Sequence, residues 1–272
     1  MIYQPQFAPP PVAPPIEPLR CDVLLFVATS TEKEKLREIA GEMGFSFTRI
    51  NRSFRYYDLG QIGTYQRVLA VKTEIGPFSQ GGSAARALMA VAETKATAII
   101  SVGMAFGVNR GQQKHGDVLV SNALFTYDDR RVYSTKRRWG KSDYSKLEPY
   151  YAKPSLLNSL RSLSSRDEWK NRVRFGPMLT GGARIHCRKF RDELVKALSR
   201  ENESIIGGEM EGAGLLAASD PAAPTWVIVK GICDFADRRR DEEFEVWRGS
   251  ACENAARFVL TALRDFDPQA EN

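Results

Sequence analysis

Apolar runs of strand length alternate along this chain with segments of helical pattern, and this alternation most limits the possible fold. Continuous apolar runs are typical of strands buried on both faces of a sheet. The predicted strands lie at 23–28, 67–76, 96–108, 117–125, 173–182 and 225–234, and the predicted helices at 29–44, 83–95, 155–165, 190–200, 207–219 and from Trp247 onward. The pattern predicts an α/β fold with a largely parallel sheet covered on both faces.

The distribution of these strands predicts one domain, with the bounds 20–272. The segment before it, 1–19, holds half of the chain's 14 prolines. Proline fixes φ and removes a backbone donor, so we expect this segment to be a disordered arm outside the domain.

Several classes of protein are disfavoured by composition. The chain has no apolar run of about 20 residues, the length that a membrane span needs, and its start lacks the pattern of a secretory signal. Its four cysteines form no CxxC pair and it has two histidines, so we expect free thiols and no metal site. These features favour a cytoplasmic protein without a membrane partner or cofactor.

The chain is basic, with a net charge of +6, which is compatible either with an anionic ligand or with a solvated charged surface. Two predicted loops, 134–141 and 237–241, concentrate this charge. They leave room for a substrate that carries 5′-phosphates, and the alternative is that both are solvated surface. No nucleic-acid partner is expected. The basic residues concerned are Lys136, Arg137, Arg138, Lys141, Arg238, Arg239 and Arg240.

Acidic residues and glycines follow several of the predicted strands. In open α/β sheets, ligands bind beyond the carboxyl ends of the strands, so these residues should converge on one edge. The sequence has neither a nucleophilic triad pattern nor the phosphate-binding motifs GxGxxG and GxxxxGK[ST]. The residues that follow strands or lie in the GGEMEGAG turn include Thr29, Glu32, Met104, Ala105, Phe106, Glu209, Met210, Glu211, Cys233 and Asp234.

Carboxylates gathered at a sheet edge suit glycosidic chemistry. One carboxylate stabilises an oxocarbenium-like transition state while another protonates the leaving group, and burial raises the pKa of such an acid. Each carboxylate also has a simpler interpretation. Glu32 and Thr29 have the spacing of a capping box, Glu209 and Glu211 suit a helix N-terminus, and Asp234 suits a turn.

Taken together, the segments GGEMEGAGLLAAS, WVIVKGICDFAD and WRGSACENAARF resemble the nucleoside phosphorylase/purine nucleosidase superfamily. The pattern is most similar to methylthioadenosine/S-adenosylhomocysteine nucleosidases. IISVGMAFGVN, HGDVLVSNALF and VATSTEKEKL extend the resemblance, which runs from about Val23 to Leu263. It implies a three-layer αβα sandwich with a mixed central sheet, and a homodimer or higher homo-oligomer in which a partner loop closes the pocket.

The resemblance also implies roles for individual residues. Glu211 would hold the ribose and stabilise the cationic sugar, and Met210 would pack against the ribose. Asp234 would protonate or hydrogen-bond the purine at N7, and Glu32 would orient the attacking water. The rest of the implied pocket consists of Met104, Ala105, Phe106, Arg184, Ile185, Glu209 and Cys233.

Three features depart from the family pattern. Cys233 stands where these nucleosidases usually have Ser, and Arg184 stands about where they present a base-stacking aromatic. A guanidinium can also stack on a purine. The third departure is that Ser101 precedes the glycine loop, where related phosphorylases often carry an Arg, and VATSTEKEKL contains no Arg either. The phosphate clamp therefore looks absent, which favours water as the nucleophile.

The predicted activity is hydrolysis of the N-glycosidic bond of a purine, most simply adenine, nucleoside or nucleotide. One alternative is a phosphate-dependent purine nucleoside phosphorylase. A second is an ATP-depleting nucleosidase that acts as an effector of bacterial antiphage defence. A third is a non-catalytic nucleotide sensor, against which the retained trio Glu32, Glu211 and Asp234 argues, because binding alone does not need all three.

Overall fold

The structure, a computed structural model, describes residues 18–135, 138–219 and 224–266. Its main sheet has ten strands in the order β11-β10-β6-β12-β5-β1-β4-β3-β2, with β9 paired to β6. The strands are β1 Val23–Val27, β2 Thr48–Asn51, β3 Arg55–Ile62, β4 Tyr65–Lys72, β5 Ala98–Gly107, β6 Val118–Thr126, β9 Tyr150–Tyr151, β10 Val173–Thr180, β11 Gly207–Glu209 and β12 Thr225–Asp234.

The sheet is mixed. Strand β1 is parallel to both β4 and β5, and β12 is parallel to β5. Antiparallel pairing joins β12 to β6 and adds β3 and β2 beyond β4. Strand β11 pairs with both β10 and β5, so β5, β12, β6, β10 and β11 close into a ring. The predicted α/β class with a mixed central sheet is confirmed.

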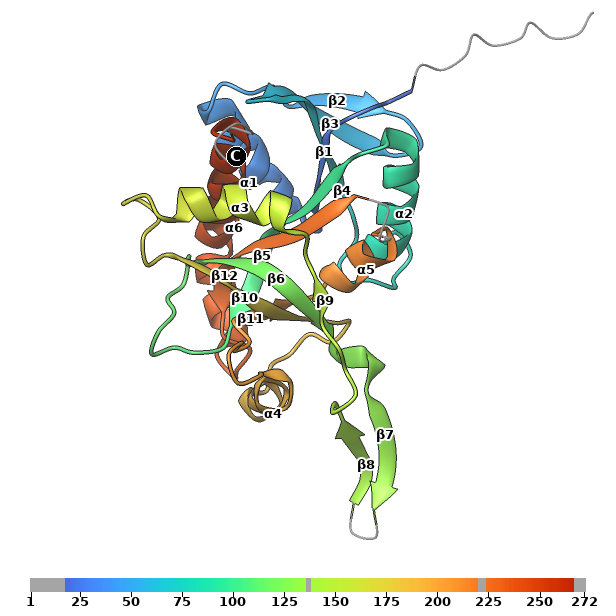
Figure 1. The fold of residues 1–272 in the computed structure, drawn as a ribbon, viewed down its shortest axis with the longest axis vertical. Coiled ribbons are helices and arrows are strands. Elements are labelled where there is room, and N and C mark those ends of the chain that lie inside the picture. The colour runs from blue at the N-terminus through green and yellow to red at the C-terminus, as the bar shows by residue number, and fades with distance from the viewer. Residues whose placement is uncertain (1–17, 136–137, 220–223, 267–272) are drawn as a thin grey trace, which may run out of the picture.

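Helices cover both faces of this sheet (Figure 1). Helices α1, α3 and α6 lie on one face, and α2 and α5 lie on the other. Helix α4 packs Leu194 and Leu198 into a smaller apolar cluster with Leu179 of β10. The bounds are α1 Ser30–Glu42, α2 Ser83–Thr94, α3 Pro154–Ser164, α4 Arg188–Leu198, α5 Gly212–Ala217 and α6 Arg240–Arg264.

The apolar runs of the sequence form the buried strands. Every residue of β1 is buried, as is every residue of β12 after Thr225. Strands β2 and β3, which no apolar run predicts, lie at the sheet edge with many exposed or half-buried residues. Helix α6 begins at Arg240, earlier than the predicted start at Trp247. Acidic residues in its first turn, among them Asp241 and Glu243, stabilise this N-terminus through the helix dipole.

The region 126–150, which has no clean periodicity, contains a short helix (Tyr127–Asp129) and a hairpin, β7 (Arg131–Thr135) and β8 (Arg138–Asp143). Figure 1 shows the hairpin projecting away from the rest of the domain. Because its described residues are mostly exposed, no buried face imposes an alternating pattern.

At the N-terminal end, Leu19 is buried in the core, so packing begins one residue before the predicted boundary at 20. The rest of the predicted arm, residues 1–17, lies outside the described residues. Within the described part of the chain, no helix combines the length and the apolar character needed to cross a membrane.

Candidate active site

Every residue that the sequence predicts for the site lines one pocket of about 270 Å³. Its walls come from the ends of β1, β5 and β12, from the turn after β11, and from the start of α6. The predicted members are Glu32, Met104, Ala105, Phe106, Arg184, Ile185, Glu209, Met210, Glu211, Cys233 and Asp234, and the others are Ala28, Thr29, Ile75, Ala183, Gly208, Arg240 and Phe244. The carboxyl ends of the parallel strands bring these distant segments together, as expected for a ligand site.

Glu32 caps α1 and also faces the pocket. The Thr29 hydroxyl accepts a hydrogen bond from Glu32 N, and Glu32 Oε2 accepts from Thr29 N at 2.8 Å, which completes a capping box. The same carboxylate accepts from Ala28 N at 2.7 Å and, through Oε1, from Met104 N at 3.0 Å. The capping interpretation is therefore correct, and it leaves the carboxylate fixed at the pocket wall.

Gly103 makes this close approach possible. A Cβ at this position would lie 1.8 Å from Glu32 Oε1, so no other residue could stand here without moving the carboxylate. Gly103 lies within β5 rather than in a loop after the strand, and its missing side chain leaves the space that the Glu32 carboxylate fills.

Glu211 faces the same region of the pocket from the turn after β11. Its Oε1 accepts a hydrogen bond from Gly76 N at 3.3 Å, and its Oε2 accepts from Lys230 Nζ at 3.2 Å. The main-chain carbonyl of Glu211 accepts from the Ser83 hydroxyl of α2 at 2.7 Å, which anchors the turn. The carboxylate of Glu211 is therefore used by a cation and an amide from distant segments, and it does not cap α5.

Lys230, which the sequence analysis did not single out, is fully buried in β12. Its ammonium lies 3.2 Å from Glu211 and 3.8 Å from Glu32, so one cation joins the two carboxylates. Burial by itself would lower the pKa of Lys230, but the charges of Glu211, Glu32 and Glu209 outweigh it and raise that pKa. The signal available in the sequence was a single charged residue inside the apolar strand TWVIVKGICD.

Glu209 binds the start of α5. Its Oε2 accepts hydrogen bonds from Glu211 N at 2.8 Å and Gly212 N at 2.9 Å, and Gly212 N also contacts its Oε1. Burial raises the pKa of Glu209 above its ordinary value, with the charge of Lys230 acting the other way. Both carboxylate oxygens are therefore used by the protein, which matches the helix-start interpretation of this residue.

Asp234 lies at the end of β12 in different surroundings. Its Oδ1 accepts a hydrogen bond from Ala236 N at 2.8 Å, and its Oδ2 accepts one from the Cys233 thiol at 3.2 Å. The guanidinium of Arg240 approaches Oδ2 only to 3.9 Å. Burial raises the pKa of Asp234, against the weaker effects of these three partners. A carboxyl group of this kind is suited to hold a proton and to donate it.

Cys233 preserves the hydrogen bond that a serine would supply. Burial and the adjacent Asp234 raise the pKa of the Cys233 thiol well above its ordinary value, so the group remains protonated. Its second contact is the Ala105 carbonyl at 3.5 Å. The substitution of Cys for Ser is thus compatible with a protonated donor beside Asp234.

The two basic loops differ in their relation to the pocket. Arg240 of the 237–241 run lines it, with its guanidinium 4.7 Å from the ring of Phe244. Arg184, which is exposed, lines it as well. Lys141, in the hairpin, instead lies 5.8 Å from the ring of Tyr133.

Other predicted basic residues do not contribute described pocket contacts. Arg238 and Arg239 are exposed, and neither lines the pocket. Residues 136 and 137 and the side chain of Arg138 lie outside the described residues. In the described part of the chain, no group of three or more His, Cys, Asp and Glu side chains is placed to hold a metal ion.

Comparison with solved structures supports the fold. A 5′-methylthioadenosine/S-adenosylhomocysteine nucleosidase from Neisseria meningitidis superposes with a TM-score of 0.71 at 21% identity, covering 90% of this chain and 99% of that one. Futalosine hydrolase of Helicobacter pylori gives a TM-score of 0.72 at 16% identity, covering 90% of this chain and 97% of the other.

Sequence comparison adds a curated relative. A death domain-containing ATP nucleosidase from Amphimedon queenslandica is 26% identical over 183 residues, which is 61% of this chain and 33% of that protein. The chain thus spans about a third of the length of this relative. Residues 22–264 match the phosphorylase superfamily, a range that takes in every residue of the pocket. The chain therefore belongs to the phosphorylase superfamily.

Proposed function

We propose that this protein hydrolyses the N-glycosidic bond of a purine nucleoside or nucleotide. The observation that carries the proposal is that Glu32, Glu211 and Asp234 meet in one pocket. At one end of it, burial raises the pKa of Asp234, and at the other end Glu32 and Glu211 are both paired with the ammonium of Lys230. These are the groups that departure of a base and attack of water require.

Asp234 is the proposed general acid. As the bond between C1′ of the sugar and N9 of the purine breaks, the bonding electrons move onto the base. The proton of the Asp234 carboxyl passes to N7, so the purine leaves as a neutral molecule. The burial that raises the pKa of Asp234 favours the protonated form, which is the form that can supply this proton.

Glu211 and Glu32 act on the sugar side. The carboxylate of Glu211 accepts hydrogen bonds from the ribose hydroxyls and stabilises the positive charge that develops on the sugar. Glu32 accepts a proton from the water whose oxygen bonds to C1′, giving ribose and free base. Lys230 holds both carboxylates in place, because its ammonium lies between them.

Water is favoured over phosphate as the nucleophile. The cation at the Glu32 end, Lys230, is already paired with Glu32 and Glu211. The space beside Gly103, where another residue would have its Cβ, is filled by the Glu32 carboxylate. A phosphate dianion there would face two carboxylates. Phosphorolysis would require Lys230 to leave both partners.

The proposed substrates carry adenine, and a 5′-phosphorylated nucleotide is among them. The curated relative is named an ATP nucleosidase, and the Neisseria nucleosidase was solved with methylthio-immucillin-A. Arg184 and Arg240 place two cations at the pocket wall, where an anionic substrate could be held. Depletion of ATP in antiphage defence is the biological role that this substrate would suit.

We also propose that the protein is a homodimer or a higher homo-oligomer. Phe78 is 77% exposed, and Leu88 and Met89 of α2 are about half exposed. Val132 and Tyr133 add apolar surface on the projecting hairpin, and a two-stranded hairpin alone is marginally stable in water. Light scattering should give at least twice the mass of the chain, and a monomer at working concentration would contradict this.

The test of the activity is release of free base from adenosine, methylthioadenosine, AMP, ATP and NAD, followed by chromatography with and without inorganic phosphate. Hydrolysis needs no inorganic phosphate in the assay, and it gives free ribose or, from a 5′-phosphorylated substrate, ribose that keeps its 5′-phosphates. Formation of ribose 1-phosphate only when phosphate is present would identify a phosphorylase. Tight binding without base release from any substrate would identify a sensor. Asp234→Asn is the control for a contaminating activity.

A further inference from the structure

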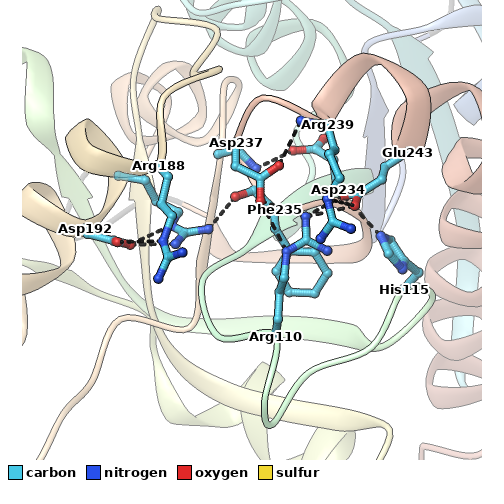
Figure 2. Close-up of polar contacts among 11 residues, drawn as sticks. Arg110, His115, Arg188, Asp192, Asp234, Phe235, Asp237, Arg239 and Glu243 are labelled. Atoms are coloured by element: carbon cyan, nitrogen blue, oxygen red, sulfur yellow. Dashed lines mark hydrogen bonds and ion pairs between the residues drawn. The ribbon is translucent and has the colours of Figure 1, made fainter.

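Outside the pocket, Arg110 joins three segments of the chain: the loop after β5, the loop after β12 and the first turn of α6. This residue lies in the loop after β5, and it does not line the pocket. Figure 2 shows its guanidinium between Asp237, in the loop after Asp234, and Glu243, in the first turn of α6. Arg110 Nε and Nη2 donate to Asp237 Oδ2 at 3.2 and 2.8 Å, and Nη2 also contacts both oxygens of Glu243 at 2.8 and 2.9 Å.

The same guanidinium packs on Phe235, the residue after Asp234. Its central carbon lies 4.3 Å from the ring centroid of Phe235, and His115 meets that ring edge-on at 5.2 Å. From α4, the buried Arg191 donates to the Phe235 carbonyl at 2.5 Å. Two other segments therefore hold the loop that follows Asp234. Arg110 contacts the ring of Phe235 and the carboxylate of Asp237 (Figure 2), and α4 contacts the Phe235 carbonyl.

The contacts made by Arg110 are better protected than an ordinary surface ion pair. The side chains of Asp237 and Glu243 are 13% and 12% exposed, and that of Arg110 is 32% exposed. Burial by itself would raise the pKa of Asp237, but the hydrogen bonds from Arg110 and Arg239 N, together with the charge of Arg110, hold it below its ordinary value. The pairing is therefore kept in the ionised form at neutral pH.

The residues that Arg110 contacts lie close in the chain to residues that line the pocket. Asp237 is three positions after Asp234, and Glu243 is adjacent to Phe244, which lines the pocket. Arg110 itself follows the strand whose end supplies Met104 and Phe106 to the facing wall. Strands β5 and β12 are already paired in the sheet, so what Arg110 adds is a link from the loop after β5 to the loop after Asp234 and to the first turn of α6.

We propose that Arg110 is a positioning residue, which holds the Asp234 loop and the start of α6 closed over the pocket so that the acid stays dry and aimed at the leaving group. The inference rests on the proposed function. A displacement of about 1 Å at a reacting group can lower the rate on the order of 100-fold. If the loop loosens, water reaches Asp234 and its pKa falls toward the ordinary value, because burial is the largest cause that raises it. The charge of Glu243 also raises this pKa, and Ala236 N, Cys233 and Arg240 lower it, so the loss of burial has to outweigh the unpaired charge of Glu243.

The test compares Arg110→Ala with Arg257→Ala. Arg257 is a matched control: it is 37% exposed, bridges Glu42 and Glu253, and lies on α6 away from the pocket. For Arg110→Ala we expect kcat to fall roughly 10- to 100-fold with a smaller change in KM. The limb of the kcat–pH profile that reports loss of the Asp234 proton should move to lower pH. Arg257→Ala should leave both unchanged.

Two further measurements keep the outcome decisive. Amide hydrogen exchange in residues 235–239 should become faster in Arg110→Ala while exchange in β12 is unchanged, and this readout does not depend on catalysis. Asp237→Asn, which keeps the shape of the side chain, should reproduce the effect if Arg110→Ala does not fold. Ethylguanidinium should restore part of the activity of Arg110→Ala.

Failure of this inference differs from failure of the proposed activity. If the unmodified protein releases no base from any substrate, the activity is wrong, and hydrogen exchange still decides whether Arg110 holds the loop. An unchanged pH profile and unchanged exchange in Arg110→Ala, with only a lower melting temperature, would overturn the positioning role and leave Arg110 as a stabilising contact.

Discussion

At one end of the pocket, Glu32 and Glu211 share the fully buried ammonium of Lys230, at 3.8 and 3.2 Å. At the other end, the cation described nearest to Asp234 is the partly exposed guanidinium of Arg240, at 3.9 Å. The paired carboxylates have a cation within 3.8 Å and backbone amide donors. Asp234 has one amide, a thiol and low exposure, so burial raises its pKa. Three of the four carboxylates that line the cavity therefore lie in two different environments.

This difference in surroundings is the physical basis for the roles proposed for these residues. A pair of titratable groups whose surroundings push their pKa values apart can act as acid and base at the same pH. Lys230 offsets the mutual repulsion of the Glu32 and Glu211 charges, because its ammonium lies within 3.8 Å of both. The following changes test whether the two ends differ as the structure indicates.

Replacement of the acid should have the largest effect. Asp234→Asn keeps the shape of the side chain but cannot give up a proton, and kcat should fall by about 10²- to 10⁴-fold with little change in binding. Single-turnover base release measures this loss. A variant with a near-native rate would remove Asp234 from the mechanism.

The same variant should be more stable than the parent at neutral pH. Because folding raises the pKa of Asp234, the stability linked to this group is fully present below its ordinary pKa and is lost as pH rises through the raised value. Asn carries no charge and avoids that loss. Urea unfolding at neutral and acidic pH should show a gain at neutral pH that shrinks in acid, and a gain of equal size at both would contradict the assignment.

Loss of the buried cation should destabilise the other end. Lys230→Met leaves Glu32 and Glu211 buried without their partner, and removal of one member of a buried ion pair typically costs about 3–5 kcal/mol. Urea unfolding measures the change, with Lys230→Arg as the variant that keeps the charge. If Lys230→Met were as stable as the parent, the two carboxylates would not depend on Lys230.

Glu211→Gln tests the anion itself. The charge that faces the cationic sugar is removed while the hydrogen-bonding shape is kept, and we expect kcat to fall roughly 10²- to 10³-fold. Steady-state kinetics separate the two possible roles. Normal turnover at saturating substrate with a raised KM would show that Glu211 holds the ribose and does nothing more.

The smallest effects concern the two basic loops. Arg240→Ala should raise KM for AMP and ATP at least roughly tenfold if the guanidinium binds phosphate, with adenosine affected less and the difference reduced by salt. Lys141→Ala, in the hairpin, should leave KM for every substrate within about twofold of the parent, because exposed charges contribute little. A rise in KM for Lys141→Ala would place the hairpin of a second copy at the pocket.

Much of the architecture could be predicted because burial leaves a direct record in composition. The strands β1, β5, β6 and β12 coincide with apolar runs, since parallel strands covered on both faces need apolar side chains at consecutive positions. Strands β2 and β3 and the hairpin escaped prediction because their half-exposed residues leave no continuous apolar run. The early start of α6 was missed because its first turns are polar.

The sequence by itself determined which carboxylates stand at strand ends, and the order of the motifs that mark the family. The sequence did not determine which of these carboxyl groups would have a raised pKa. Lys230 and Glu32 are far apart in the chain, and only the parallel packing of β1, β5 and β12 brings the ammonium within 3.8 Å of that carboxylate. The protonation of a carboxyl group depends on desolvation and on charges within a few ångströms. Those quantities are properties of the packed structure, so tertiary structure decided that the pKa of Asp234 is raised and that Arg240 lines the pocket while Lys141 lies on the projecting hairpin.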